Sequence, residues 1–160
     1  MTNPLRDAVF YFDTSALVKR YVAEIGSEWV VALCHSSTGN TIGTVRITQA
    51  EAAAAFASKR RSGGLSQAHH TGILCDLSHD FAHQYLLVEV NQPLVDLAVS
   101  LTGRRKLRGY DAVQLAAALT LNDLLTQAQF SPLTFVAADD DLLAAARSEG
   151  LIADNPNRYL

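Results

Sequence analysis

The sequence predicts an α/β fold in which helices cover both faces of a central parallel sheet. Two observations predict it: short apolar runs typical of buried strands recur along the chain, and longer segments of helical periodicity separate them. The chain has 160 residues, so we expect one domain over residues 1–160. A chain of this length buries roughly 70% of its unfolded surface and folds without disulfides or structural metal.

Five short apolar segments are predicted as strands, and seven longer segments as helices. The strands are residues 8–12, 40–45, 85–90, 133–138 and 151–154. The helices are residues 15–21, 26–35, 47–61, 66–84, 93–104, 111–125 and 140–149. Because strands and helices alternate, we expect right-handed crossovers between parallel strands.

Local signals predict the ends of several helices. Ser27 is expected to cap the second helix, because its hydroxyl can accept a hydrogen bond from a free amide at the helix start. Pro93 suits a first helical turn, where no backbone donor is needed. Gly63 and Gly64 end the Ala-rich third helix, and Gly150 ends the last helix, since glycine readily adopts the left-handed conformation found there.

The charge balance excludes a protein that is basic over its whole surface. There are 13 Lys and Arg residues against 16 Asp and Glu residues, a net charge of −3. Local basic clusters at residues 58–64 and 103–109 could still contact RNA phosphates or acidic partner residues, or could simply stabilise helix C-termini. Lys19 and Arg20 lie one turn past Asp13 and could reach a bound phosphate, but a solvated face is expected for them.

The N-terminal residues lack the basic start and long apolar core of a signal peptide, and no segment approaches the ~20 apolar residues that span a bilayer. Cys34 and Cys75 have no metal-binding or disulfide spacing, which is typical of buried free thiols in a reducing compartment. We therefore expect a cytoplasmic protein without membrane association.

Four acidic residues lie where strands end or helices begin, and each allows two interpretations. They are Asp13, Glu51, Asp111 and Asp139. Each aspartate can cap a helix or favour its positive end, and Glu51 with Thr48 fits the capping box. The alternative is a shared ligand site beyond the carboxyl ends of the strands, where open α/β sheets bind ligands.

Considered together, the acids favour a cation site. In the predicted sheet, at least Asp13 and Asp139 meet at the same edge. Two carboxylates 4 Å apart repel by roughly 4 kcal/mol at an effective dielectric constant of 20, and a divalent cation relieves this repulsion. An all-carboxylate ligand set favours Mg²⁺ or Mn²⁺ over Zn²⁺, which prefers His and Cys. Spacing alone leaves helix capping open.

Four stretches resemble the successive motifs of PIN-domain ribonucleases, and especially of the VapC-type toxins of bacterial toxin–antitoxin pairs. They are "FYFDTSALVKRYV", "TQAEAAAAF", "LRGYDAVQLAAAL" and "FVAADDDLLAAARSEGL". The resemblance covers nearly the whole chain and implies a single PIN domain with a three-layer α/β/α sandwich around a central parallel sheet. It also implies a Mg²⁺- or Mn²⁺-dependent endoribonuclease toxin that forms a homodimer and binds a VapB-type antitoxin.

The resemblance also implies roles for individual residues. The metal ligands and catalytic residues would be Asp13, Glu51, Asp111 and Asp139. They would hold a metal-activated water that attacks an RNA phosphodiester bond. Ser15 would support Asp13 through its hydroxyl, and Asp141 is a possible additional ligand beside Asp139.

Two other functions are considered. A catalytically silent PIN fold that binds RNA or protein is disfavoured, because clustered acids weaken RNA binding. An aspartate-phosphorylating domain is also disfavoured: Ser15 occupies the position of the second acid of a dehalogenase, and no lysine follows the fourth strand as a receiver domain requires. His79 and His83 have the i, i+4 spacing of a helical metal pair, but no H-E-x-x-H motif accompanies them.

Overall fold

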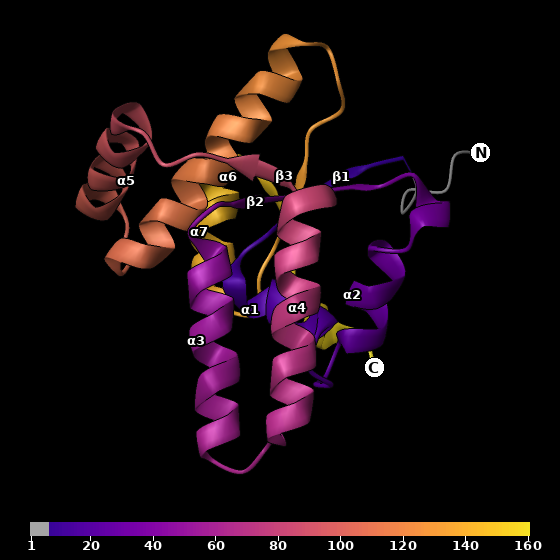
Figure 1. The fold of residues 1–160 in the computed structure, drawn as a ribbon. Helices are drawn as coiled ribbons and strands as arrows, with labels where there is room; N and C mark the ends of the chain where they lie inside the picture. Colours follow the sequence, from indigo (N-terminus) through magenta and orange to yellow (C-terminus); the bar gives the residue numbers. More distant parts are fainter. Residues whose placement is uncertain (1–6) are drawn as a thin grey trace.

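A parallel sheet forms the centre of the molecule (Figure 1). The computed structural model describes residues 7–160, and in this part of the chain five parallel strands form one sheet in the order β3-β2-β1-β4-β5. The strands are β1 (Val9–Phe12), β2 (Thr41–Val45), β3 (Leu86–Val88), β4 (Thr134–Val136) and β5 (Ile152–Asp154). The prediction of a parallel sheet is confirmed. The expectation that the N-terminal residues form no signal peptide falls partly on residues 1–6, which lie outside the described residues.

The helices lie close to their predicted positions. They are α1 (Thr14–Leu17), α2 (Ser27–Leu33), α3 (Thr48–Arg61), α4 (Gln67–His83), α5 (Gln92–Arg104), α6 (Gly109–Gln127) and α7 (Asp140–Ser148). Short 3₁₀ turns occur at Val18–Arg20, Ser36–Thr38 and Pro156–Arg158. The first predicted helix is therefore divided into α1 and a 3₁₀ turn. No helix in residues 7–160 combines the length and hydrophobicity needed to cross a bilayer.

Strand β1 shows why a continuous apolar run forms a central strand. Phe10 and Phe12 pack into the hydrophobic cluster on one face of the sheet, and Tyr11 packs into the cluster on the other face. Because successive side chains of a strand point to opposite faces, a strand covered on both faces must be apolar at every position. The Tyr11 ring also stacks on Phe135 of β4, with ring centroids 5.6 Å apart.

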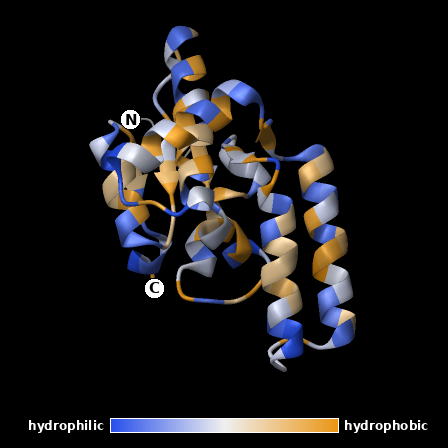
Figure 2. Cartoon of the chain, turned by 90° about the vertical axis from the view of Figure 1, so that its left-hand side faces the viewer, coloured by the Kyte–Doolittle hydropathy of each residue, from blue (hydrophilic) through white to orange (hydrophobic). Residues whose placement is uncertain are grey.

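Two layers of helices cover the sheet, which completes the predicted three-layer α/β/α sandwich (Figure 1). Helices α1 to α4 contribute to the cluster that contains Phe10 and Phe12. Helices α5 to α7 contribute to the cluster that contains Tyr11, where small alanines of α6 lie against the strands. Figure 2 shows hydrophobic residues concentrated on the strands at the centre, with polar residues at the far end of the α3–α4 hairpin.

The winding direction of the chain changes between β1 and β4. From β1 the chain adds β2 and β3 on one side, and then adds β4 and β5 on the other. At the carboxyl ends of these two central strands, the Asp13 amide donates to the Val136 carbonyl at 3.1 Å. Open parallel sheets bind ligands at such a switch point, because the connections diverge there and leave a crevice.

The prediction that Ser27 caps α2 is wrong. The capping position belongs to Gly26, which has φ 82°, and Ser27 is the first helical residue. The Ser27 hydroxyl instead accepts from the Glu24 amide at 2.9 Å and donates to the Val22 carbonyl at 3.2 Å. Gly26 is needed because the backbone of Pro156 lies against it, where a Cβ would collide with the Pro156 carbonyl oxygen.

The expectation of a solvated face for Lys19 and Arg20 is also wrong. Lys19 is 5% exposed, and its ammonium group donates to Glu24 at 3.2 Å. The Arg20 guanidinium lies 3.3 Å from the Asp80 carboxylate and donates to the Tyr85 hydroxyl at 2.9 Å. Both cations therefore stabilise the packing of the first helical layer. The partner of Lys19 is only five residues away, whereas the partners of Arg20 lie about sixty residues further along the chain.

We expect Gly26→Ala to lower the free energy of unfolding by about 3 kcal/mol, because it combines an unfavourable positive φ with a backbone collision. Gly63→Ala is the matched control: its φ is 84°, but no atom lies within 4 Å of the added Cβ. The control should cost about 1 kcal/mol. Urea unfolding of both variants measures the difference, and equal losses would contradict the proposed collision.

Candidate active site

A cavity of about 290 Å³ lies beyond the carboxyl ends of the central strands. Its lining includes all four acidic residues that the sequence singles out. The lining is Asp13, Thr14, Ser15, Val18, Glu51, Ala55, Asp111, Gln114 and Asp139. The four carboxylates come from different elements, since Asp13 follows β1, Glu51 lies in α3, Asp111 in α6, and Asp139 follows β4. Tertiary structure thus collects acids that are up to 126 residues apart in sequence (139 − 13).

Asp13 caps a helix and also faces this cavity, so the two sequence interpretations are compatible. Its Oδ1 atom accepts from the Ala16 amide at 2.9 Å and from the Ser15 hydroxyl at 2.7 Å. Within residues 7–160, its Oδ2 atom accepts no hydrogen bond. Asp13 is only 5% exposed. One oxygen therefore holds the helix start, and the other is free to bind a ligand.

Ser15 connects the ends of the two central strands. Its hydroxyl donates to Asp13 and accepts from the Ala138 amide, just beyond β4, at 2.8 Å. Because the hydroxyl both donates and accepts, its orientation and that of the Asp13 carboxylate are restricted. The contact expected between Ser15 and Asp13 is present.

Asp139 repeats the arrangement at the start of α7. Its Oδ1 atom accepts from the amides of Asp141 at 2.9 Å and Leu142 at 3.1 Å. The Asp141 side chain is exposed and lines a neighbouring cavity, not the one that contains Asp13. A role for Asp141 as an additional ligand stays a prediction.

Thr48 and Glu51 do not form the capping box that their spacing suggested. The capping position of α3 is Ile47, which makes no side-chain hydrogen bond, and Thr48 is already the first helical residue. Both side chains instead accept from the Gln114 amide, Thr48 Oγ1 at 2.9 Å and Glu51 Oε1 at 3.1 Å. The capping interpretation of Glu51 is therefore wrong.

Gln114 organises the site, and the sequence analysis assigned it no role. It is 2% exposed, and its Oε1 atom accepts from the Tyr11 hydroxyl at 2.8 Å. Its Nε2 group reaches Thr48, Glu51 and, at 3.2 Å, the Thr14 hydroxyl. The two hydrogens of this amide group are shared among three acceptor oxygens, so both its donor hydrogens and its acceptor oxygen form hydrogen bonds. The available signal was its position three residues after Asp111, which places both on one face of α6.

Burial and mutual repulsion disfavour the charged forms of the acids. Burial raises the pKa of Asp13 to about 7, and the charges of Asp111 and Glu51 add to this effect. The hydrogen bonds from Ser15 and from the Ala16 amide act in the opposite direction, because they stabilise the carboxylate. Burial therefore has the largest effect on the ionisation of Asp13, and the neighbouring charges have a smaller one.

Glu51 and Asp111 also have raised pKa values. Burial raises the pKa of Glu51, with a further contribution from Asp111, while hydrogen bonds from Gln114 and Thr14 lower it. Burial also raises the pKa of Asp111; the charge of Arg108 opposes this shift, and the charge of Asp139 adds to it. Asp13, Glu51 and Asp111 thus all have raised pKa values, and a cation in the cavity would favour their ionised forms.

The donor chemistry of the cavity fits Mg²⁺ or Mn²⁺, since the candidate ligands are carboxylate oxygens. In residues 7–160, no group of three or more His, Cys, Asp or Glu side chains is placed to hold a metal ion. A magnesium ion usually keeps several waters and uses only one or two carboxylates, so it does not need a three-ligand cage. The cavity thus offers suitable donors without a preformed cage.

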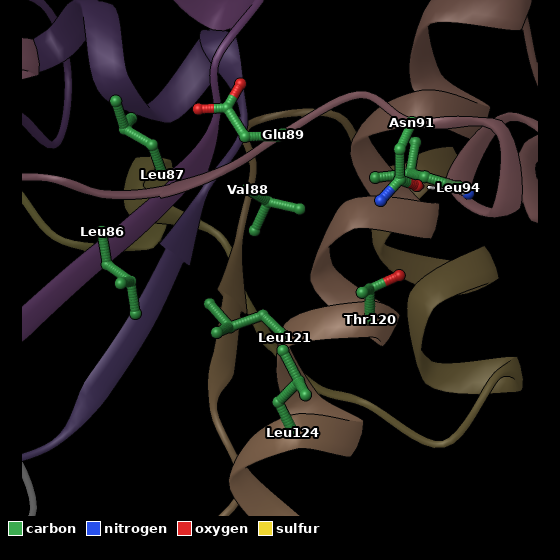
Figure 3. Close-up of a pocket in the computed structure, with 9 residues that line it drawn as sticks. All are labelled: Leu86, Leu87, Val88, Glu89, Asn91, Leu94, Thr120, Leu121 and Leu124. Atoms are coloured by element: carbon green, nitrogen blue, oxygen red, sulfur yellow. Dashed lines mark hydrogen bonds between the residues drawn. The ribbon is translucent and has the colours of Figure 1, made fainter.

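Other features from the sequence lie apart from the acids. His79 and His83 are exposed on α4, with ring centroids 4.7 Å apart, and line none of the cavities described here. Figure 3 shows a separate, mainly apolar cavity of about 250 Å³ between β3 and α6, lined by residues such as Leu86 and Leu121. Its acidic residue, Glu89, is paired with Arg46 at 2.6 Å. It therefore lacks the available carboxylates of the first cavity.

Comparisons with solved structures show what the fold is similar to. The chain matches a structure of FitAB bound to the IR36 DNA fragment, with 16% identity, 92% of this chain and 94% of that chain covered, and a TM-score of 0.60. A toxin–antitoxin complex from Klebsiella pneumoniae matches with 16% identity, coverage of 92% and 97%, and a TM-score of 0.54. VapBC2 from Rickettsia felis, bound to promoter DNA, matches with 14% identity, coverage of 92% and 98%, and a TM-score of 0.60.

No family model matches the chain, and no curated protein does. At 14–16% identity, the structural likeness shows the fold. It confirms the fold expected from the resemblance to PIN-domain ribonucleases.

The raised pKa of Asp13 predicts a pH dependence of stability. Between about pH 4 and pH 7 the folded protein binds a proton at Asp13 that the unfolded chain has released, so stability falls as the pH rises through this window. The expected loss is on the order of a few kcal/mol, since one pKa unit corresponds to about 1.4 kcal/mol.

Asp13→Asn keeps the cap and should make the metal-free protein more stable than wild type at pH 8 but not at pH 4. Urea unfolding at both pH values measures this. A variant with the same pH profile as wild type would contradict the assignment.

We expect Gln114→Met to lower the free energy of unfolding by about 3 kcal/mol, because it removes the buried hydrogen bonds that the Gln114 amide forms with Tyr11, Thr48 and Glu51. Gln127→Met, at the exposed end of the same helix, is the control and should change stability by less than about 0.5 kcal/mol. Chemical denaturation measures both. Similar effects at the two positions would mean that the network contributes little.

Proposed function

We propose that this protein is a divalent-metal-dependent endoribonuclease and acts as the toxin of a toxin–antitoxin pair. One observation carries the proposal: carboxylates of Asp13, Glu51, Asp111 and Asp139 line a single cavity at the switch point of a parallel sheet. Acids converging there are costly without a cation. The stability of the fold does not require four carboxylates at one place.

A bound Mg²⁺ or Mn²⁺ would orient a phosphodiester, activate a water and stabilise the departing oxygen. The protein's own residues hold the ligands for that ion. Asp13 is restrained by Ser15 and the Ala16 amide, and Glu51 is restrained by Gln114. These neutral donors position carboxylates without removing their charge, which is what a cation site requires.

The likeness to toxin–antitoxin complexes supports the biological part of the proposal. The complexes from Klebsiella pneumoniae and Rickettsia felis share this fold over nearly the whole chain. We extend this to a VapB-type antitoxin as the partner of this protein, to RNA as its substrate, and to a homodimer as its assembly.

Asp111→Asn tests the catalytic assignment. We expect it to reduce Mg²⁺- or Mn²⁺-dependent cleavage of RNA by at least about 100-fold, because a neutral amide is a weaker ligand for a hard cation. The melting temperature should be unchanged or raised, since repulsion with Asp139 and the other acids is relieved. Cleavage is measured on labelled single-stranded RNA, with EDTA as the metal-free reference.

Asp123→Asn is the matched control, since Asp123 is an exposed aspartate of the same helix and lines none of the cavities described here. It should cleave at the wild-type rate. If Asp111→Asn also cleaves at that rate, the catalytic role of this acid is wrong. If wild-type protein binds RNA but never cleaves it with either metal, the protein is instead a PIN-fold binding module.

A further inference from the structure

A second cavity, of about 250 Å³, shares a wall with the acid-lined cavity. Asp111 and Asp139 line both of them. The complete lining of the second cavity is Lys106, Leu107, Arg108, Asp111, Asp139, Asp141 and Leu142. Two cations therefore stand beside the carboxylates that we assign to catalysis.

The charged groups of these two cations are not engaged in strong interactions of the fold. The Arg108 side chain is 87% exposed, and its Nε atom lies 3.7 Å from Asp111 Oδ2, too far for a hydrogen bond. Within residues 7–160, Lys106 forms no ion pair or hydrogen bond. An exposed pair of this length contributes little to stability.

The preceding arginines of the same segment behave differently. Arg104 donates to Glu149 at 2.6 Å and to the Ser100 hydroxyl at 2.6 Å. Arg105 lies 3.5 Å from the same Glu149 carboxylate and donates to the Ser148 carbonyl at 3.3 Å. These contacts attach the end of α5 to the end of α7. Arg104 and Arg105 therefore hold the segment in place, whereas Lys106 and Arg108 are available to bind a ligand.

Leu107 fixes the segment from the other side. It is half-buried and packs against the hydrophobic cluster that contains α5, α6 and α7. Lys106 and Arg108 flank it and are exposed. The segment is therefore anchored by a buried side chain between the two available cations, so these cations are held next to the acids at low cost in chain entropy.

We infer that Lys106 and Arg108 form a binding site for backbone phosphates of the RNA strand, directly beside the scissile phosphodiester. This inference rests on the proposed function. A polyanionic strand is repelled by four carboxylates, and cations on the adjoining wall offset that repulsion and release counterions when phosphates bind. A guanidinium group can also bind two phosphate oxygens at once, which fixes the register of the strand.

The test compares two double variants that each remove two positive charges. Lys106→Gln/Arg108→Gln removes the proposed site, and Arg60→Gln/Arg61→Gln removes two arginines at the far end of α3. Binding of a hydrolysis-resistant phosphorothioate single-stranded RNA is measured by fluorescence anisotropy over a range of NaCl concentrations in Mg²⁺ buffer. Cleavage of unmodified RNA by the wild type is measured in parallel, and melting temperatures establish that the variants fold.

For the first variant we expect about tenfold weaker binding near 0.1 M salt, and a slope of log K against log salt that is smaller by about 1.4, since each single-strand phosphate contact contributes about 0.7. The control should lose much less of the slope. Equal losses of RNA affinity in the two variants would overturn the proposed phosphate site. Unchanged RNA binding by the first variant would also overturn it, and this is the result expected if the segment binds an acidic protein instead.

The outcomes also separate the site from the proposed function. If the wild type cleaves RNA while the first variant binds normally, only the phosphate site is wrong. If RNA binding depends on Lys106 and Arg108 but the wild type does not cleave, the phosphate site stands and the nuclease function is wrong. A wild type that does not bind RNA overturns both.

Discussion

The burial of Asp13 at the junction of the two central strands is the constraint on which the rest of the site depends. A carboxylate that is 5% exposed needs compensation, and the fold supplies it from neutral donors, namely the Ser15 hydroxyl and the Ala16 amide. Ser15 also accepts from the Ala138 amide, so the same interaction joins the ends of β1 and β4. The position of the first acid and the geometry of the switch point are therefore determined together.

The buried amide of Gln114 connects the sheet with the helical layers on both of its faces. It accepts from Tyr11 in the sheet and donates toward Thr48 and Glu51 in α3, while belonging to α6 on the opposite face. Neutral donors hold the acids without neutralising them, so burial raises the pKa of Asp13 and Glu51 and the remaining repulsion between the acids adds to it. This retained repulsion is the physical basis for expecting a divalent cation.

Charge is distributed differently around the acids than in the protein as a whole. The chain carries a net charge of −3, yet Lys106 and Arg108 are exposed beside Asp111 and Asp139. Lys19 and Arg20, in contrast, are paired with Glu24 and Asp80. A negatively charged strand would therefore meet two positive charges in the second cavity, next to the carboxylates of Asp111, Asp139 and Asp141.

Features that depend on local patterns could be predicted from the amino-acid sequence. Apolar runs and helical periodicity predicted the strands, their parallel arrangement and the four acids at element ends, because side-chain periodicity and burial act over a few residues. Which side chains contact one another depends instead on how the helices and the sheet pack together. Gly26 and not Ser27 occupies the capping position of α2, because Pro156 packs against it. Thr48 and Glu51 form no capping box, because both accept hydrogen bonds from Gln114. Such contacts join residues more than sixty positions apart, and their free energy depends on how helices and sheet pack, which no local pattern encodes.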